Sequence, residues 1–383
     1  MAFINRQIAK SISLHLANYP ILALTGPRQS GKTTLLKKIL PEYRYVSLED
    51  IDLRSFAEED PIGFLKKYDK HVIFDEIQRV PHMFSYLQTV VDESQQMGQF
   101  VLSGSQNFHL LTHITQSLAG RVAIYKLLPF DIPELEESGL LLQDWKSLII
   151  KGFYPAIYDR DMDHSVYFSN YIQTYVNRDV SELTKVQDLK RFNNFFGLCA
   201  ARTGQLVNLS NLANECGISQ PTAKSWLSIL ESSYIIFLLQ PYYENFNKRL
   251  VKSPKLYFYD TGLVSYLLGF RSVEDLDNQS LIGNLFENLI IADMFKRNHH
   301  QYQLRDYWFW RDSNGHEIDL LSKRSGGFDI YEIKSTQTVL PRLTKGMDFF
   351  DSISNGQVKS KTLIYGGNEN QERSKFTIRA WPG

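Results

Sequence analysis

Apolar and polar positions alternate in blocks along the first third of the chain. Short apolar runs with branched and aromatic residues, typical of buried strands, are separated by polar or helix-forming stretches. Strands that alternate with helices in this way predict a parallel α/β sheet with helices on both faces. The predicted strands are 21–24, 43–48, 71–76, 99–102 and 122–127.

A helix-turn-helix pattern follows in the middle of the chain. Residues 209–216 and 220–230 read as two helices joined by a turn at Gly217, and Ser219 fits the cap of the second helix. The strand-like run 235–239 then suggests a winged version. Such a segment either offers its second helix to DNA or serves as a structural or protein-docking unit.

The pattern as a whole predicts an α/β protein. Breaks in the pattern divide the chain into four parts. Pro129 and Pro133 end the first α/β region, and a helical stretch rich in aromatic residues follows. Beyond the helix-turn-helix pattern, strand-like segments surround one amphipathic helix over 281–297. We expect a parallel-sheet domain at 1–133, a helical linker or lid at 134–203, a winged helix-turn-helix-like segment at 204–250 and a second α/β domain at 251–383.

Composition narrows the class of protein only in part. The 383 residues are 43% apolar, which suits more than one folded core, and the formal net charge of zero argues neither for nor against nucleic acid. The two cysteines, Cys199 and Cys216, are too few for a disulfide framework or a zinc site, which favours a reducing compartment. No signal peptide or membrane-spanning run is visible, so we expect a cytoplasmic protein without a membrane partner.

The strongest chemical signal lies directly after the first predicted strand. The sequence GPRQSGKTT fits the phosphate-binding pattern G-x-x-x-x-G-K-[ST], with a strand before it and a helix after it. Its backbone N–H groups would face phosphates, Lys32 would reach the outer phosphates, and the Thr33 hydroxyl would hold Mg²⁺. A chance glycine-rich turn is the alternative. The predicted nucleotide-binding residues are Gly26, Pro27, Arg28, Gln29, Ser30, Gly31, Lys32, Thr33 and Thr34.

Two later strand ends carry residues that such a loop needs. Asp75 and Glu76 end the third predicted strand, where Asp75 would hold the Mg²⁺ shell and Glu76 would polarise the attacking water. An acid that merely caps a helix is the alternative. The polar run 103–107 ends the fourth strand, and Ser103 would sense the outer phosphate or orient the water. Together with the loop, these residues predict a nucleoside triphosphatase.

Arg121 precedes the fifth predicted strand. An arginine there could neutralise charge on the transferred phosphoryl group, in its own subunit or in a neighbour within a homo-oligomer formed through the ATPase domain. An ordinary surface ion pair explains the residue equally well.

A second signal for nucleic acid is a group of basic residues after the helix-turn-helix pattern. Lys248, Arg249, Lys252 and Lys255 form a dense basic stretch that could grip DNA phosphates without reading bases. The second helix of the pattern carries only Lys224 as a basic residue. A solvated hairpin is the alternative for the basic stretch.

The C-terminal strands carry two acids and a lysine. Asp319 lies on one strand, and Glu332 and Lys334 lie two residues apart on the next, so strand alternation puts these two on one face. Asp319 and Glu332 could hold Mg²⁺ or Mn²⁺, Lys334 could orient or deprotonate a water, and Glu287 on the preceding helix could add an outer carboxylate. The set predicts metal-dependent cleavage of a phosphodiester, with an ion pair between neighbouring strands as the alternative.

Taken together, these stretches resemble a bacterial and archaeal family that joins a P-loop ATPase of the AAA type to a C-terminal domain of unassigned function. The resemblance implies ATP and Mg²⁺ as ligands, a helical and winged-helix middle, and a C-terminal fold similar to PD-(D/E)xK nucleases. Glu287, Asp319, Glu332 and Lys334 match the active-site positions of that fold, although Ile318 replaces the proline of its name. The likeness rests on residues 26–34, 72–76, 103–105, 117–121, 253–263, 317–319 and 332–334.

Two functions from different classes follow from these signals. The first is an ATP-driven DNA-processing enzyme in which nucleotide state controls a metal-dependent nuclease. The second is an ATP-dependent switch or scaffold whose C-terminal domain only binds a protein or nucleic-acid partner. The complete set of Asp319, Glu332 and Lys334 favours the first, and the neutral chain with its weakly charged second helix favours the other.

Overall fold

Five parallel strands form the first sheet of the computed structural model, which describes residues 4–104, 117–176, 189–243, 250–277 and 279–382. The strand order is β2-β3-β4-β1-β5, and all carboxyl ends meet at one edge because every pair is parallel. The bounds are β1 (Ile21–Thr25), β2 (Arg44–Ser47), β3 (Val72–Asp75), β4 (Phe100–Gly104) and β5 (Val122–Lys126). The parallel sheet predicted from the sequence is confirmed.

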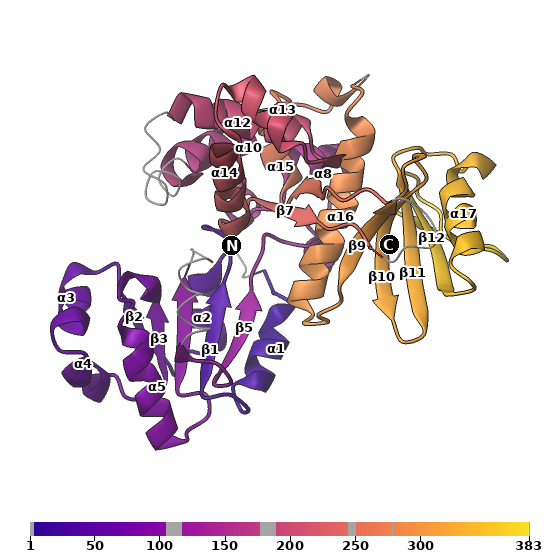
Figure 1. Ribbon diagram of the computed structural model, residues 1–383. Coiled ribbons are helices and arrows are strands. Elements are labelled where there is room, and N and C mark those ends of the chain that lie inside the picture. Colours follow the sequence, from indigo (N-terminus) through magenta and orange to yellow (C-terminus); the bar gives the residue numbers. More distant parts are fainter. Residues whose placement is uncertain (1–3, 105–116, 177–188, 244–249, 278, 383) are drawn as a thin grey trace.

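Helices cover both faces of this sheet, as predicted (Figure 1). Along β1, Ile21 and Ala23 pack into one apolar cluster and Leu22 and Leu24 into another, so the strand is buried on both sides. The face of Leu22 is covered by α1 (Ile8–His15) and α2 (Lys32–Ile39). The opposite face is covered by α3 (Ile51–Glu59), α4 (Pro61–Lys67) and α5 (Met83–Ser94).

The middle region is mainly helical and contains a small antiparallel sheet. Its first helices are α7 (Ile132–Glu137), α8 (Trp145–Lys151), α9 (Pro155–Asp159), α10 (His164–Tyr171) and α12 (Leu189–Ala201). Two more, α13 (Leu209–Cys216) and α14 (Gln220–Ser232), lie where the helix-turn-helix is predicted. Gly217 ends α13 in the left-handed conformation, and Ser219 Oγ accepts a bond from the Thr222 N–H at the start of α14.

The small sheet shifts a boundary that the sequence suggested. Strand β8 (Lys255–Phe258) lies between β6 (Gln205–Leu206) and β7 (Ile236–Leu239), and α15 (Thr261–Leu267) follows it. The expected boundary at residue 251 is therefore too early, because 255–267 pack with the middle region. Pairing partners far apart in the chain, which local periodicity does not reveal, cause the difference.

A six-stranded mixed sheet forms the C-terminal domain. The bounds are β9 (Tyr307–Arg311), β10 (Glu317–Arg324), β11 (Gly327–Lys334), β12 (Val358–Tyr365), β13 (Gln371–Glu372) and β14 (Thr377–Ala380). The first three strands are antiparallel, whereas β12 runs parallel to β11 and to β14. One face is covered by α17 (Lys345–Ile353) and the other by α16 (Ile282–His300) (Figure 1).

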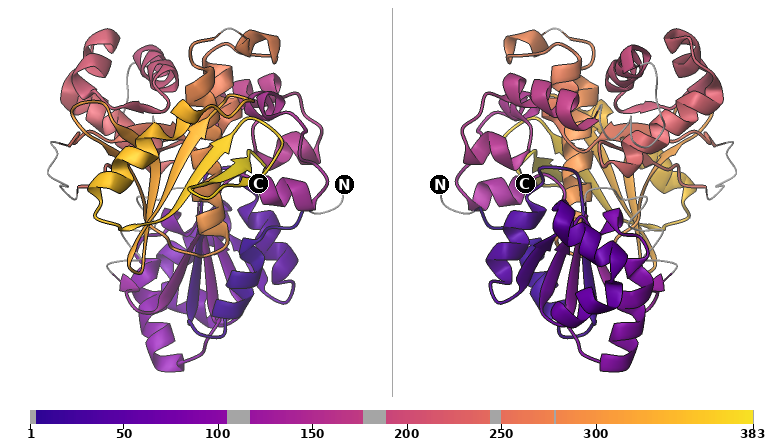
Figure 2. Two further views of the ribbon diagram at one scale, coloured as in Figure 1. Left: turned by 90° about the vertical axis from the view of Figure 1, so that its right-hand side faces the viewer. Right: turned by 90° about the vertical axis from the view of Figure 1, so that its left-hand side faces the viewer.

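The helix α16 contacts all three parts of the molecule. Its body packs between the middle region and the C-terminal sheet, and its last turn reaches the end of β5. One apolar cluster that includes α16 extends from Leu128 to Trp381. In both views of Figure 2 the first domain lies below the two other parts. None of the described helices combines the length and the apolar character that a membrane span requires.

Candidate functional site

The phosphate loop begins at a position that leaves no room for a side chain. Gly26 has φ 148°, and a Cβ there would lie 2.1 Å from the carbonyl oxygen of Leu127. Gly31, with φ 91°, is the N-cap of α2. Lys32 Nζ donates hydrogen bonds to the carbonyls of Gly26 (3.0 Å) and Pro27 (2.8 Å). A cation and a helix N-terminus thus lie at one loop, the combination that binds phosphate.

The predicted Mg²⁺ ligands lie in contact. Thr33 Oγ1 donates to Asp75 Oδ2 at 2.9 Å, although the two residues come from α2 and β3. Tyr45 on β2 donates its hydroxyl to the same oxygen at 2.5 Å. Burial and the bond to Asp75 raise the pKa of Tyr45, so the phenol remains a donor. Tyr45 was not predicted as a site residue, because nothing in the local pattern shows that β2 lies next to β3.

Glu76 and Ser103 lie at the same sheet edge. Glu76 follows β3 in the left-handed conformation, with φ 54°, and Gln78 Nε2 donates to its Oε2. In the register of the sheet, Ser103 stands opposite Asp75 on one side and Leu24 on the other. Ser103 is therefore placed between the loop strand and the acidic pair. The neighbouring residues 105–107 lie outside the described part of the chain.

Two buried hydroxyl groups at this sheet edge bear on whether the site fits a nucleotide. Ser30 Oγ and Ser103 Oγ have no hydrogen-bond partner among the described residues, and both side chains are fully buried. A buried donor without an acceptor costs about 1–3 kcal/mol. Phosphate oxygens, or a water bound to them, would supply acceptors at both positions. The donor set of the loop, Thr33 and Asp75 therefore fits a nucleoside triphosphate with Mg²⁺.

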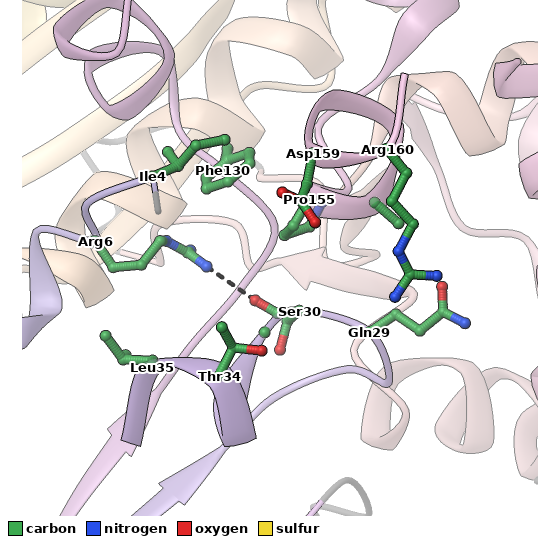
Figure 3. A pocket seen from close by; sticks show the side chains of 12 residues that line it. Ile4, Arg6, Gln29, Ser30, Thr34, Leu35, Phe130, Pro155, Asp159 and Arg160 are labelled. Carbon is green, nitrogen blue, oxygen red and sulfur yellow. Dashed lines mark hydrogen bonds between the residues drawn. The ribbon is translucent and has the colours of Figure 1, made fainter. Parts of the chain in front are cut away.

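A cavity of about 560 Å³ adjoins the loop (Figure 3). One side carries apolar groups, among them Ile4, Leu35 and Phe130, which suit the flat face of a base. Across the cavity, Figure 3 shows Arg160 from the end of α9 beside Gln29 of the loop. Most of these lining residues were not predicted from the sequence, because they come from four separate segments. The full lining is Ile4, Arg6, Gln29, Ser30, Gly31, Thr34, Leu35, Phe130, Pro155, Ala156, Asp159 and Arg160.

Arg6 joins the loop to the start of the middle region. Its Nη1 donates to the carbonyl of Ser30 at 2.9 Å, and its Nη2 donates to the carbonyl of Leu128 at 2.6 Å. Its Nε lies 3.1 Å from Glu134 Oε1 in an ion pair that is almost fully buried. Through these contacts, Arg6 holds the loop carbonyl and the Leu128 segment together. Loss of Arg6 would be costly, because it would leave the buried Glu134 carboxylate without its ion-pair partner.

The last turn of α16 is anchored to the same segment. His300 Nε2 accepts a bond from the Leu128 N–H at 3.2 Å, and His300 Nδ1 lies 2.8 Å from Asp131 Oδ2. Asp131 and Glu134 form the capping box that starts α7. These three side chains are close enough to hold a metal, but each already binds protein groups. We therefore assign this cluster a structural role.

Arg121 lies at the wrong edge of the sheet for a role at its own phosphate loop. It precedes β5, and its carbonyl accepts a bond from the N–H of Ile21, the first residue of β1. The loop follows the opposite end of β1. Arg121 forms an exposed ion pair with Asp92, with an Nε–Oδ1 distance of 2.5 Å. The prediction of a role in its own subunit is wrong, and the surface ion pair describes the residue as it stands.

The predicted basic stretch is only partly a surface feature. Lys252 is exposed, but Lys255 is buried and lies within an ion cluster, so the prediction is wrong for Lys255. Lys248 and Arg249 lie outside the described residues. Lys224 is exposed on α14.

Asp319, Glu332 and Lys334 meet in the C-terminal sheet. Lys334 Nζ lies 2.8 Å from Asp319 Oδ2 and 2.8 Å from Glu332 Oε2. Asp319 Oδ2 also accepts a bond from the Ile333 N–H at 2.8 Å. Both carboxylates are nearly buried, while the Lys334 side chain is 33% exposed. Glu332 and Lys334 share a face, as strand alternation predicts, and Asp319 reaches them from the neighbouring strand β10.

A second lysine lies beside this set. Lys255 Nζ on β8 lies 2.9 Å from Glu287 Oε1 on α16 and forms a close ion pair with Glu317 Oε1 on β10. The Tyr257 hydroxyl donates to the same Glu287 oxygen at 2.5 Å. Lys255, Tyr257 and Glu317 were missed as site residues, because their meeting depends on the contact between the middle region and the C-terminal domain.

Burial and the neighbouring charges together set the pKa values of the carboxylates at this site. Burial and the nearby Asp319 raise the pKa of Glu332 to about 9. Burial also raises the pKa of Glu287, against the lowering effect of Lys255. The pKa of Asp319 is lowered, because Lys334 and Lys255 outweigh its burial. The oxygen donors suit Mg²⁺ or Mn²⁺, but among the described residues no three of these carboxylates converge on one point, since the lysines lie between them.

Three family models match successive parts of the chain. Residues 18–136 match a family model described as an AAA domain, and residues 142–274 and 282–382 match two domains of unknown function, DUF8612 and DUF4143. Uncharacterised proteins of Mycobacterium bovis and Mycobacterium tuberculosis are each 28% identical over 372 residues, covering 94% of this chain and 80% of theirs.

Two solved structures align with parts of this chain at low similarity. The Walker-type ATPase of Pyrococcus abyssi covers 69% of this chain and 96% of its own, with 15% identity and a TM-score of 0.45. Domain III of the Thermotoga maritima replication initiation protein DnaA covers 42% and 81%, with 19% identity and a TM-score of 0.29. The first part of the chain thus matches an AAA domain in sequence and has the parallel sheet and the phosphate loop of a P-loop nucleotide-binding fold.

Proposed function

We propose that this protein binds ATP and hydrolyses it with Mg²⁺. The observation that carries the proposal is the contact between Thr33 and Asp75 at the loop that Lys32 closes. Bound Mg²⁺ would neutralise charge on the outer phosphates. Thr33 and Asp75 would hold the ion, and Lys32 would exchange its loop carbonyls for phosphate oxygens. Glu76, directly after Asp75, would accept a proton from the attacking water.

Glu76→Gln tests the hydrolytic step. The amide cannot accept a proton, so we expect ATP binding to persist while turnover falls on the order of a hundredfold or more. Titration with a fluorescent nucleotide measures binding, and phosphate release measures turnover. Lys32→Ala should lose binding itself, and Glu58→Gln, at an exposed carboxylate on α3, should change neither quantity. Normal turnover in Glu76→Gln would exclude Glu76 as the base.

We further propose that nucleotide state controls a metal-dependent nuclease site in the C-terminal domain, with DNA as its substrate. The support is the convergence of Asp319, Glu332 and Lys334, with Glu287 on the adjacent helix. Asp319 and Glu332 would hold Mg²⁺ or Mn²⁺, and Lys334 would orient the water that attacks the phosphodiester. The ion would supply a lower water pKa and stabilise the charge that develops.

A cleavage assay tests the proposed nuclease site. The protein is incubated with single-stranded, duplex or branched DNA, with and without ATP, and with Mg²⁺, Mn²⁺ or a chelator. Cleavage should require the metal, and Asp319→Ala and Lys334→Ala should lose it while keeping ATPase activity. Lys361→Ala is a matched control, because Lys361 also lies between two carboxylates, Asp348 and Asp351. Cleavage that survives both site substitutions would place the activity elsewhere.

An ATP-dependent switch or scaffold is the second candidate function, and one observation favours it. The two lysines already neutralise carboxylates of the C-terminal site, as in a structural ion cluster. The scaffold would bind nucleic acid or protein without cutting. For DNA binding through Lys224 and Lys252, each lost phosphate contact should flatten the plot of log affinity against log salt by roughly one unit. ATPase activity without any metal-dependent cleavage would favour this second function.

Arg121 keeps a proposed catalytic role only in a homo-oligomer formed through the ATPase domain. Mixing Arg121→Ala protein with Lys32→Ala protein tests this role. If Arg121 acts on a neighbour's phosphates, the mixture should recover turnover that neither variant shows alone. An Arg121→Ala variant with normal turnover would leave only the surface ion pair.

A further inference from the structure

We propose that Tyr45 is a positioning residue of the ATP site, which leaves Asp75 a single oxygen for the metal and so favours Mg²⁺ over the larger Ca²⁺. This inference rests on the proposed ATPase function and names a residue that sets the metal specificity of its site. Tyr45 lies on β2, next to the strand β3 that ends in Asp75. It would act through this carboxylate and not on the nucleotide itself.

The two oxygens of Asp75 are occupied unequally. Oδ2 accepts the Tyr45 hydroxyl at 2.5 Å and the Thr33 hydroxyl at 2.9 Å. Oδ1 accepts one longer bond, from the Glu76 N–H at 3.2 Å, and the described part of the chain offers Asp75 no further donor. A carboxylate oxygen has about two lone-pair positions. Oδ2 is therefore filled by two hydroxyl groups, whereas Oδ1 keeps a position for the shell of a metal.

Strand and helix geometry together direct Tyr45 to this carboxylate. Tyr45 stands opposite Ile73, two residues before Asp75, so the alternation of the two strands puts Tyr45 and Asp75 on one face. The helix α2 covers that face, and its residues Thr33 and Lys37 lie one turn apart. Thr33 contacts Asp75, and Lys37 Nζ lies 3.6 Å from the centre of the Tyr45 ring. The ring is thus held between β2 and α2, with its hydroxyl on Asp75.

The two hydroxyl groups on Oδ2 have different roles. Thr33 follows Lys32 of the phosphate loop, and its proton goes to Asp75, so its oxygen lone pairs remain available to a metal. Tyr45 lies outside the loop and reaches the site through Asp75. Burial and the bond to Asp75 raise the pKa of Tyr45, so the phenol keeps its proton. Tyr45 therefore orients the carboxylate, whereas Thr33 both orients it and offers a ligand.

A carboxylate held in this way suits Mg²⁺ better than Ca²⁺. Mg²⁺ demands octahedral geometry and keeps several waters, whereas Ca²⁺ takes more oxygens and often binds both oxygens of one carboxylate. Asp75 cannot turn both oxygens to one ion unless a bond to Oδ2 breaks. Without the Tyr45 hydroxyl, Oδ2 would have a free position and the carboxylate could turn, so discrimination against Ca²⁺ would weaken.

Nucleotide binding tests the proposal without relying on hydrolysis. The Kd of a fluorescent ATP analogue is measured for the full-length protein in a chelator, in Mg²⁺ and in Ca²⁺, with each metal at a concentration that saturates the nucleotide. We expect wild type to bind the Mg²⁺ complex more tightly than the Ca²⁺ complex. In Tyr45→Phe this preference should fall about tenfold, the effect of one hydrogen bond to a charged group, while the Kd in chelator stays that of wild type.

Tyr43→Phe is the matched control. The Tyr43 hydroxyl donates to the Gly98 carbonyl at 2.5 Å, and these residues precede β2 and β4, at the edge of the sheet away from the phosphate loop. This variant also loses one phenol hydrogen bond, but it should keep the preference for Mg²⁺. Thermal unfolding of both variants checks that the domain remains folded.

The outcomes distinguish this inference from the proposed function. A Tyr45→Phe protein with the wild-type preference for Mg²⁺, or with all three Kd values raised equally, would overturn the role of Tyr45 and leave the ATP site in place. A wild-type protein that binds the Ca²⁺ complex as tightly as the Mg²⁺ complex would also overturn it. If the wild-type Kd does not depend on a divalent ion at all, the proposed Mg²⁺ site fails together with this inference.

Discussion

Gly26 shows how strongly the ATP site depends on one backbone position. A Cβ at this residue would overlap the Leu127 carbonyl oxygen, and φ is 148°, a conformation that other residues avoid. Both the overlap and the unfavourable φ involve backbone atoms, which cannot rotate away as a side chain could. The loop and the segment after β5 therefore approach each other only because this residue is glycine.

Gly26→Ala should destabilise the ATPase domain by roughly 3 kcal/mol or more and abolish nucleotide binding. Thermal unfolding and nucleotide titration measure the two effects. Gly120→Ala is the matched control: Gly120 also has positive φ (77°), but its new methyl would meet no described atom within 4 Å beyond its chain neighbours. The control should cost only about 1–2 kcal/mol and keep nucleotide binding. Equal losses in both variants would show that backbone conformation, not the close approach, matters at Gly26.

Among single residues, the sequence predicts those whose role is local and misses those whose role depends on distant contacts. Thr33 and Asp75 were predicted because motif and strand end mark them, and they meet. Arg6 and Tyr45 carry no such mark, although both bind predicted site residues. Lys255 stands among other basic residues in the chain, and nothing local shows that it is buried against two glutamates.

At the scale of elements, α16 is fixed at its end by buried polar contacts. His300 accepts the Leu128 N–H and contacts Asp131, and Lys296 Nζ donates to the Phe130 carbonyl at 2.6 Å. Burial lowers the pKa of Lys296 to about 8. These bonds fix the last turn of the helix on the segment that follows β5.

His300→Ala should lower the free energy of unfolding by roughly 2–5 kcal/mol, because it leaves the buried Leu128 N–H unpaired and removes the partner of the buried Asp131 Oδ2. Urea unfolding measures the loss. Gln301→Ala, one residue later and exposed, should change stability by less than about 0.5 kcal/mol. A similarly small loss in His300→Ala would mean that the apolar contacts alone hold the end of α16.

Most elements could be predicted because their apolar periodicity is local. The strands of the first sheet and the long helix α16 appear at the expected places, with ends that differ by a few residues. The small sheet of β6, β7 and β8 could not be predicted as a unit. Its first strand has two residues and pairs with a strand some fifty residues later, so neither period nor length gives a signal.

At the scale of the whole molecule, the middle region and the C-terminal domain share one apolar core. The buried face of α16 includes Leu285, Phe286 and Leu289, which belong to the cluster that begins at Leu128. The chain break suggested by the family matches, between 274 and 282, therefore cuts through a packed core.

A fragment of residues 282–382 should consequently fold poorly, since it exposes the apolar side of α16. A fragment of residues 128–382 keeps the whole core and should unfold cooperatively. Thermal unfolding followed by circular dichroism, with dye binding to exposed apolar surface, distinguishes the two. A cooperative transition of the shorter fragment near that of the longer one would show that the C-terminal domain is an independent unit.

The length of α16 has a thermodynamic consequence. Glu287 and His300 are thirteen residues apart, or about 20 Å along a stiff helix. One end contacts the ion cluster, and the other contacts the segment that Arg6 joins to the phosphate loop. If a ligand at the loop shifts this helix, linkage is reciprocal: the factor by which ATP changes the affinity for Mn²⁺ must equal the factor by which Mn²⁺ changes the affinity for ATP. Measuring either factor therefore determines the other.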